Sequence, residues 1–182
     1  MNKKALIILA EGFEEVEAIT PIDLLRRAPI EVTVAGLTSQ VKGARGVLVT
    51  TDKTVDSVTA DFDCLILPGG GLGAENLHRS ARVNALIKEM DSKGKLIAAI
   101  CASPGVVLAP TGILKNKSVT GYPGMLENFD ASTQYLEQDV VADGRLITSR
   151  GPATAFAFAL AIIEHLAGKE TAEKISKATL FS

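Results

Sequence analysis

The sequence predicts an α/β protein: a three-layer α/β/α sandwich built on a mostly parallel sheet. Two observations predict it. Short aliphatic segments alternate with amphipathic ones along the chain, and the aliphatic segments lack alternating polar residues. Strands of that kind are typical of parallel sheets covered on both faces. Repeated strand–helix–strand order implies right-handed crossovers, with helices on both sides of the sheet. We expect a single domain over residues 1–182.

The predicted strands are short aliphatic segments bounded by glycine, proline or charged residues. They cover residues 5–9, 30–35, 64–67 and 96–100. Two further stretches break the strand–helix rhythm. Residues 47–51 follow two glycines and form a separate extended segment, and residues 138–142 and 145–148 flank an Asp-Gly pair, which predicts an antiparallel hairpin.

The predicted helices are segments with apolar residues at helical spacing: residues 14–28, 80–92, 104–109 and 152–167. The last two start with proline, which is typical of a first helical turn, and Gly168 follows the fourth as a C-cap. The stretch LPGGGLG (67–73) follows a strand, and a flexible turn is its simplest interpretation.

Composition excludes several classes of protein. A formal net charge of -2 provides no electrostatic footprint for nucleic acid, so no nucleic-acid partner is expected. The apolar run 5–10 is too short, and too closely followed by acidic residues, for a signal peptide, and no run approaches the ~20 apolar residues of a membrane span. Two cysteines fit a reducing compartment, which predicts a cytoplasmic protein.

The most informative stretch is AAICASPG (98–105), where a predicted buried strand runs directly into a predicted helix. Small residues flank Cys101 on both sides, as an abrupt strand-to-helix turn requires, and the pattern resembles a nucleophile elbow. The start of a helix beneath the sulfur would favour thiolate over thiol. A small buried hydrophobe is the alternative, and spacing alone supports both interpretations equally. Cys64 lies in mid-strand, so we expect it to be an inert packed thiol.

Three acidic residues open the first predicted helix. Glu14 and Glu15 are explained as first-turn acids that complement the helix dipole. Glu17 has Thr20, Pro21 and Leu24 as neighbours along its helix face, which leaves an inward orientation open, but the residues alone favour a solvent-exposed one. An inward carboxyl would have a raised pKa and could move protons.

Histidine and metal chemistry find no support in the sequence. His78 and His165 both lie in helical surroundings away from the elbow and are interpreted as surface or packing residues. No cluster of His, Cys and Asp has ligand spacing, so neither a metal nor a cofactor is expected. The glycines of residues 67–73 lack the Lys and Ser/Thr of a phosphate-binding loop, but beside Cys101 they could supply an oxyanion hole.

Four stretches in order along the chain resemble the DJ-1/ThiJ/PfpI superfamily, and specifically its DJ-1-like branch. They are EEVE (14–17), LPGG (67–70), AAICA (98–102) and TSRGP (148–152), and the resemblance extends over almost the whole chain. It implies a flavodoxin-like sandwich that forms a homodimer. It further implies that Cys101 is the reactive cysteine, that Glu17 hydrogen-bonds its sulfur, and that the amides of Gly70 and Ala102 bind an oxyanion. Arg45 and Arg27 fall where similar proteins carry arginines near the site and the dimer interface.

The sequence departs from the family pattern at two positions. Tyr122 stands where animal members carry a histidine near the cysteine, which puts any histidine general base in doubt. Ala102 stands where the protease-like branch has histidine, which argues against peptidase activity.

The resemblance implies a cofactor-independent enzyme in which Cys101 attacks reactive dicarbonyls such as methylglyoxal, or their glycated adducts, in glyoxalase or deglycase chemistry. The predicted partner is therefore a small carbonyl compound, with Tyr122 and Arg45 as further substrate-binding candidates. The alternative is a stress protein that senses oxidation through Cys101. Both hypotheses use one site, and turnover of methylglyoxal separates them.

Overall fold

A seven-stranded sheet forms the centre of the computed structural model, which describes residues 2–181. The strand order is β10-β11-β7-β6-β1-β2-β5, and every neighbouring pair is parallel except β10 and β11. The strands are β1 (Lys3–Leu9), β2 (Ile30–Gly36), β5 (Lys53–Thr54), β6 (Cys64–Leu67), β7 (Leu96–Ile100), β10 (Val140–Asp143) and β11 (Leu146–Ser149).

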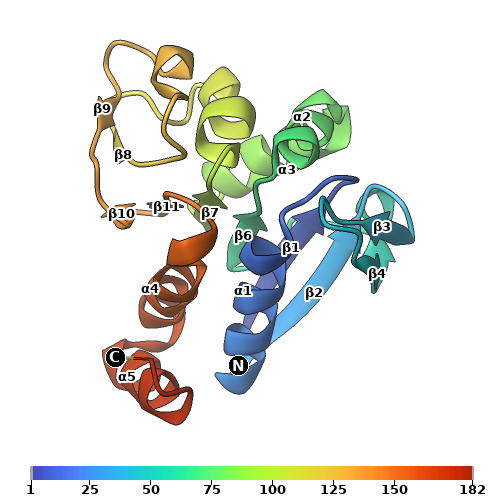
Figure 1. The fold of residues 1–182 in the computed structure, drawn as a ribbon, viewed down its shortest axis with the longest axis vertical. Helices are drawn as coiled ribbons and strands as arrows, with labels where there is room; N and C mark the ends of the chain where they lie inside the picture. The colour runs from blue at the N-terminus through green and yellow to red at the C-terminus, as the bar shows by residue number, and fades with distance from the viewer. Residues whose placement is uncertain (1, 182) are drawn as a thin grey trace.

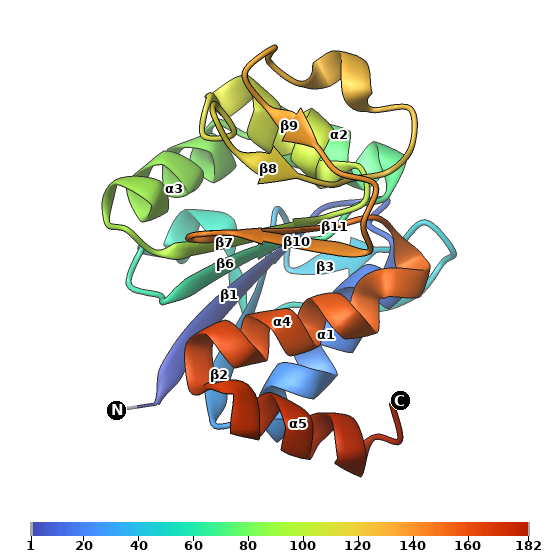
Figure 2. The ribbon, with the colours of Figure 1, turned by 90° about the vertical axis from the view of Figure 1, so that its left-hand side faces the viewer.

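Helices cover both faces of this sheet, as the two views in Figures 1 and 2 show. One face carries α1 (Glu15–Arg27), α4 (Ala155–Ala167) and α5 (Lys169–Ala178), and the other carries α2 (Gly71–Arg79) and α3 (Ala81–Ser92). A π-helical turn (Pro104–Leu108) and a 3-10 turn (Ala109–Thr111) follow β7, and further 3-10 turns span Val55–Ser57, Leu126–Asn128 and Pro152–Thr154. The predicted three-layer α/β/α sandwich is confirmed.

The predicted strands and hairpin are confirmed with small changes of boundary. The hairpin pairs Asp143 with Leu146, so its two turn residues are Gly144 and Arg145 rather than Asp143 and Gly144. Gly144 has a φ of +64°, and glycine is the residue that tight hairpins favour at such a position. Residues 47–51 contain β4 (Leu48–Thr50), which pairs with β3 (Gln40–Lys42) outside the main sheet. A second small sheet pairs β8 (Ser118–Val119) with β9 (Gln134–Tyr135).

Four helical segments depart from the sequence prediction. The helix predicted over residues 104–109 is a π-helical turn followed by a 3-10 turn. The glycine-rich stretch 67–73 is not simply a flexible turn, because α2 begins at Gly71 within it. Helix α5 has no counterpart among the predicted helices, although its apolar residues Ala172 and Ile175 are buried. The helix predicted over residues 152–167 begins as a 3-10 turn and continues as α4 to Gly168, which has a φ of +88°.

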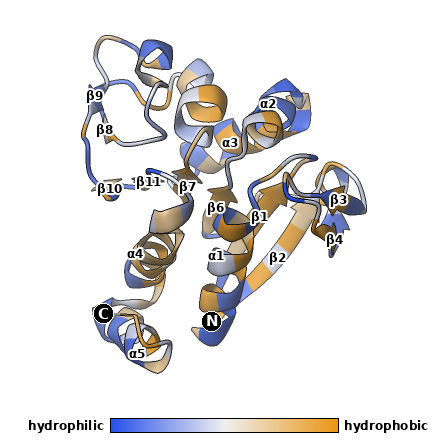
Figure 3. Cartoon of the chain, viewed as in Figure 1, coloured by the Kyte–Doolittle hydropathy of each residue, from blue (hydrophilic) through white to orange (hydrophobic). Residues whose placement is uncertain are grey.

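The hydrophobic core lies on both faces of the sheet. The central strands β1, β6 and β7 are almost entirely buried, and Figure 3 shows the hydrophobic character of β1 and β2. This matches the absence of polar alternation in their sequences. Among the residues that the structure describes, no helix has both the length and the apolar character needed to cross a bilayer.

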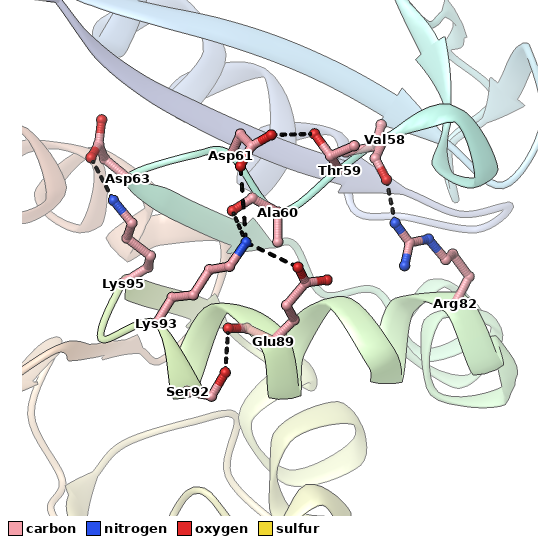
Figure 4. A network of polar contacts seen from close by, with 10 residues as sticks. All are labelled: Val58, Thr59, Ala60, Asp61, Asp63, Arg82, Glu89, Ser92, Lys93 and Lys95. Atoms are coloured by element: carbon pink, nitrogen blue, oxygen red, sulfur yellow. Dashed lines mark hydrogen bonds and ion pairs between the residues drawn. The ribbon is translucent and has the colours of Figure 1, made fainter.

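The amino ends of β6 and β7 are held by polar contacts, drawn in Figure 4. Lys95 Nζ lies 3.1 Å from Asp63 Oδ1, and the Lys4 amide donates to Asp63 Oδ2 at 3.0 Å. Lys93 pairs with Glu89 in α3 at 3.0 Å, and Arg82 donates to the Val58 carbonyl. These contacts tie α3 to the segment that leads into β6.

Candidate active site

Cys101 forms a strained turn at the carboxyl end of β7. Its φ of +64° lies in the left-handed region, which is unfavourable for a residue with a side chain. Two hydrogen bonds hold its backbone: its amide donates to the Ser149 carbonyl at 2.9 Å, and its carbonyl accepts from the Tyr122 amide at 2.8 Å. The predicted elbow geometry is therefore present.

Residues after the elbow join it to the glycine loop that follows β6. The Ser103 hydroxyl donates to the Pro68 carbonyl at 2.5 Å, and Ser103 is fully buried. Pro104 then begins the π-helical turn. The side chain of Cys101 is thereby placed at the ends of two adjacent parallel strands, where open α/β sheets bind ligands.

Gly69 lies too close to Cys101, and Gly70 too close to the segment 12–14, for either residue to carry a side chain. A Cβ added to Gly69 would lie 2.7 Å from both Cys101 Cβ and Glu17 Oε2. Gly70 has a φ of +88°, and a Cβ there would collide with the Gly12 carbonyl. The Gly69 amide donates to Glu17 Oε2 at 2.9 Å. Glycine is thus required at both positions by the proximity of other atoms.

Glu17 points inward from α1 and is fully buried. Burial raises the pKa of Glu17 to about 7, against the lowering effect of hydrogen bonds with the Cys101 sulfur and the Gly69 amide. Its other oxygen, Oε1, is also buried and has no hydrogen-bond partner among the described residues. The solvent-exposed orientation that the residues alone favoured is therefore wrong, and the structure has the inward one, because the glycine loop after β6 and the elbow cover this side chain.

The sulfur is less readily ionised than the sequence suggested. Burial raises the pKa of Cys101 to about 12, and the charge and hydrogen bond of Glu17 act in the same direction. The amides of Gly70 and Ala102 oppose this by hydrogen-bonding the sulfur. The amides therefore favour the thiolate, as expected from the sequence, but the cost of burying a charge, which the sequence analysis left out, outweighs them.

Cys101 and Glu17 are hydrogen-bonded, so they titrate as a pair. Between pH about 7 and about 12 the pair holds one proton and one negative charge. When the proton resides on Glu17, the repulsion between carboxylate and sulfur disappears, while the Gly70 and Ala102 amides still stabilise a thiolate. Between these two pH values the proton lies on the sulfur and Glu17 is ionised, so a nucleophilic thiolate forms when the proton passes from Cys101 to Glu17.

Cys64 provides an internal comparison. It is fully buried in β6, and burial raises the pKa of its thiol. It lies within the strand rather than at a turn, the charge of the adjacent Asp63 raises its pKa further, and it is packed as the sequence predicted.

Tyr122, Arg45 and Arg27, which the sequence analysis also placed near the site or the dimer interface, differ in their contacts with Cys101. The Tyr122 ring lies beside Gly151, 48% of this residue is exposed, and only its backbone amide bonds Cys101. The Arg45 guanidinium is exposed and contacts the Ala44 carbonyl at 3.5 Å. Arg27 pairs with Asp23 at 2.9 Å, at the opposite end of α1 from Glu17. The structure therefore does not bring either arginine onto Cys101 within one chain.

Glu15 is a residue whose environment the sequence analysis missed. It is buried, and its Oε1 accepts the amides of Arg45 at 2.6 Å and Val47 at 3.4 Å. It therefore holds the loop between β3 and β4 instead of being a solvated first-turn acid. No local signal distinguishes it from Glu14, because the loop that covers it is 30 residues away in sequence.

Gly69 and Ser149 were also missed as individual contributors, although both lie in motifs that were singled out. The Pro-Gly-Gly order at the end of a strand was the available signal for Gly69. Within residues 2–181, no group of three His, Cys, Asp or Glu side chains is arranged to hold a metal ion. His78 lies in the last turn of α2 and His165 in the last turn of α4.

Comparison with known proteins places this geometry in a family. The model of the DJ-1/PfpI family matches residues 3–165. Protein dj-1beta of Drosophila melanogaster is 47% identical over 99% of this chain and 98% of its own length, and its crystal structure superposes with a TM-score of 0.95 over the whole of both chains.

Two further relatives are similar over nearly their full length. The oxidized DJ-1 of Toxoplasma gondii has a TM-score of 0.95 at 42% identity, covering 99% of both chains. A Caenorhabditis elegans protein named glutathione-independent glyoxalase DJR-1.2 is 38% identical over 97% of this chain and 95% of its own. The chain therefore belongs to the DJ-1/PfpI family.

Proposed function

We propose that this protein is a cofactor-independent cysteine enzyme that converts reactive dicarbonyls, such as methylglyoxal, or their early adducts. The observation that carries the proposal is the contact between Cys101, held at a φ of +64°, and the buried acid Glu17. The name of the Caenorhabditis elegans relative, a glutathione-independent glyoxalase, supports the reaction class. The whole chain 1–182 is proposed to act as one domain.

The first step is attack by the Cys101 sulfur on the aldehyde carbon, which forms a carbon–sulfur bond. The thiol proton passes to the Glu17 carboxylate, since at neutral pH the pair holds one proton and that proton lies on the sulfur. The aldehyde oxygen becomes an oxyanion, which the amides of Gly70 and Ala102 are proposed to bind because they lie beside the sulfur. Such a donor contributes roughly 3–4 kcal/mol in well-studied oxyanion holes.

Glu17 then moves a proton between the two substrate carbons. It first returns the thiol proton to the oxyanion, which gives the neutral hemithioacetal and a Glu17 carboxylate. The carboxylate removes the proton from the former aldehyde carbon and returns it to the neighbouring carbon, while the hydroxyl proton moves to the neighbouring oxygen, which converts the hemithioacetal into a thioester of the hydroxy acid. A pKa of about 7 suits both transfers at neutral pH. Water hydrolyses the thioester and releases the hydroxy acid, so the net reaction is addition of one water. With a glycated adduct, hydrolysis also frees the amine. Tyr122 and Arg45 are proposed to contact the substrate from the rim of the site.

Turnover of methylglyoxal tests the proposal. We expect Cys101→Ala to abolish the formation of hydroxy acid, and Cys64→Ala to retain it. Glu17→Gln should lose at least about 100-fold in kcat, because general acid–base groups contribute about 10²–10⁴-fold. Full activity of a clean Cys101→Ala preparation would end the proposal.

A second candidate function is sensing of oxidation at the same cysteine. The buried oxygen Glu17 Oε1 has no partner among the described residues, and a protonated Glu17 could donate to a sulfinate at Cys101. Each equivalent of peroxide would add one oxygen to the sulfur and leave as water. Mass spectrometry after mild peroxide treatment should show two added oxygens on Cys101 and none on Cys64. Equal oxidation of both cysteines would count against this function.

We also propose that the protein forms a homodimer. Exposed apolar side chains lie together on α1 and the β3–β4 hairpin: Val16 and Ile19, which are 48% and 42% exposed, and Val47. Glu15 connects the two elements through its bond to the Val47 amide. Apolar patches of this kind are typical of interfaces. Sedimentation of wild type and Ile19→Asp tests it, and a monomeric wild type would refute it. A cytoplasmic location stays a prediction from the sequence.

A further inference from the structure

The last two residues of β11, Thr148 and Ser149, lie beside the elbow and have no role in the proposed chemistry. Both are fully buried, and β11 pairs with β7 so that Ser149 lies opposite Ile100. Successive side chains of a strand point to opposite faces of the sheet. The Ser149 hydroxyl bonds Thr154 at 2.6 Å and the Asp139 carbonyl at 2.8 Å, and the Thr148 hydroxyl contacts a different segment.

That segment is 120–122. The Thr120 amide donates to Thr148 Oγ1 at 2.8 Å, in a fully buried contact between residues 28 positions apart. Two residues later, the Tyr122 amide donates to the Cys101 carbonyl at 2.8 Å. A Cβ on the intervening Gly121 would lie 3.3 Å from the Cys101 carbonyl oxygen, so the segment is seated closely on the elbow.

Cys101 needs such support because its left-handed backbone is unfavourable for a residue with a side chain. Its amide is held by the carbonyl of Ser149 and its carbonyl by the amide of Tyr122. The end of β11 therefore governs both contacts: directly through the Ser149 backbone, and indirectly through the Thr148 hydroxyl and segment 120–122.

We propose that Thr148 is a positioning residue for Cys101. Its hydroxyl anchors segment 120–122, which fixes the Cys101 carbonyl and so keeps the sulfur against the Gly70 and Ala102 amides. Loss of the hydroxyl leaves the buried Thr120 amide without an acceptor. Because an unpaired buried donor is energetically costly, the segment moves so that this amide can bond water. The inference deepens the proposed function but concerns the thiol geometry, which is measurable without turnover.

The chain offers a matched control in Thr120. Like Thr148 it is a fully buried threonine, and the two are joined by the same hydrogen bond. Thr120 takes part through its backbone amide, while its own hydroxyl is buried with no partner among the described residues. Exchange of either side chain for valine keeps the shape, but only Thr148→Val removes a hydrogen-bonding group that the elbow uses.

The experiment compares Thr148→Val, Thr148→Ser and Thr120→Val with wild type. The first readout is the rate of Cys101 alkylation by iodoacetamide between pH 5 and 9, measured on Cys64→Ala protein so that one thiol reacts. The second is kcat and KM for methylglyoxal. We expect Thr148→Val to slow alkylation and kcat by about 10-fold with KM changed by less than about twofold, because an effect on the reacting group appears in kcat.

Thr148→Ser should restore both rates to within about twofold of wild type, since it restores the acceptor. Thr120→Val should also stay within about twofold and unfold at the same or a higher temperature, because it removes an unpaired buried hydroxyl. A Thr148→Val protein that alkylates and turns over like wild type, with only a lower unfolding temperature, would show a structural role and overturn the proposal.

Two safeguards keep the test decisive. If Thr148→Val does not fold, Thr148→Ala takes its place, because alanine leaves room for a water molecule to accept a hydrogen bond from the Thr120 amide. Thr148→Ala should slow alkylation by a factor between those expected for Thr148→Ser and Thr148→Val. If wild type has no methylglyoxal turnover, the proposed function fails, but alkylation still decides the role of Thr148. Equal slowing by Thr120→Val and Thr148→Val would refute it.

Discussion

The amino and carboxyl ends of strands β6 and β7 differ in how a nearby carboxyl group is stabilised. At the amino ends, Asp63 and Lys95 precede the strands and pair at 3.1 Å, within the polar network of Figure 4. At the carboxyl ends, Gly69 and Cys101 follow the same strands and face the fully buried Glu17. At the amino ends, Asp63 is paired with the Lys95 ammonium and the Lys4 amide. At the carboxyl ends, Glu17 Oε1 has no hydrogen-bond partner among the described residues.

The pKa values of the two carboxyls follow from this difference. Burial tends to raise the pKa of Asp63, but the Lys4 amide and the Lys95 ammonium outweigh it and hold that pKa below its usual value of 3.8. At Glu17 burial prevails and raises the pKa to about 7. The amino end therefore stabilises an ionised carboxylate, whereas the carboxyl end holds a carboxyl that can exchange its proton near neutral pH, as the proposed function requires.

The largest effect is expected from closing the space at the carboxyl end. Gly69→Ala would place a Cβ 2.7 Å from both Cys101 Cβ and Glu17 Oε2, so the acid and the thiol must separate. We expect kcat for methylglyoxal to fall by about 100-fold, because a displacement of a reacting group by about 1 Å can cost that much. Steady-state kinetics measure it.

Gly71→Ala is the matched control, two residues along the same loop. A Cβ there meets nothing within 4 Å, and Gly71 is the first residue of α2. It should keep kcat within about twofold and gain up to about 1 kcal/mol in stability, the usual advantage of alanine over glycine in a helix. Equal losses in the two variants would mean that the contacts around Gly69 do not matter for the reaction.

The second effect is the pH dependence of the reaction. Below pH about 7 the pair of Cys101 and Glu17 holds both protons, which removes the nucleophile. We expect kcat/KM to fall about tenfold for each pH unit below about 7 and to level off above it. In Glu17→Gln protein the alkylation of Cys101 should lose this midpoint. A wild-type profile that is flat from pH 5 to 8 would contradict the pairing.

The third effect is on stability. The folded pKa of Glu17 lies above its usual value of 4.5, so the stability it contributes is complete below that value and is lost as pH rises through about 7. At pH 8 the loss amounts to about 3 kcal/mol. Glu17→Gln should therefore be more stable than wild type at pH 8 by up to that amount, with the difference vanishing near pH 4. Chemical unfolding at both pH values measures it.

The sequence was informative where short-range pattern decides structure. The strands 64–67 and 96–100 were predicted with the observed boundaries, because aliphatic runs bounded by breakers need no long-range information. The elbow at Cys101 was recognisable because the small residues around it are a steric requirement of the turn itself. Tertiary contacts decided the rest. Helix α2 begins in a glycine run that resembles a loop, since those glycines are needed for close approach to Gly12 and Phe13.

The electrostatics of the site were the least predictable from sequence. Glu15 and Glu17 are two residues apart and both are buried, yet one holds a loop through the Arg45 amide and the other contacts Cys101. The dipole at a helix start is visible in sequence and favours a thiolate, whereas the burial that raises the pKa of Cys101 depends on residues from several strands and helices.

The smallest effect is expected at the amino end. Asp63→Asn keeps the shape but removes the charge that pairs with Lys95, and we expect a loss of about 1 kcal/mol at pH 7. Because the folded pKa of Asp63 is lowered, its contribution is present above pH 3.8 and is lost as pH falls through the folded value, so the variant and wild type should converge at low pH. Glu89→Gln is the control. Its partner Lys93 is 42% exposed, so solvent screens the ion pair between them and loss of the Glu89 charge should leave the free energy of unfolding unchanged. A cost equal to that of Asp63→Asn would show that the network in Figure 4 acts as one unit rather than through Asp63. Methylglyoxal turnover should not change in either variant, since the reacting groups lie at the other end of the strands.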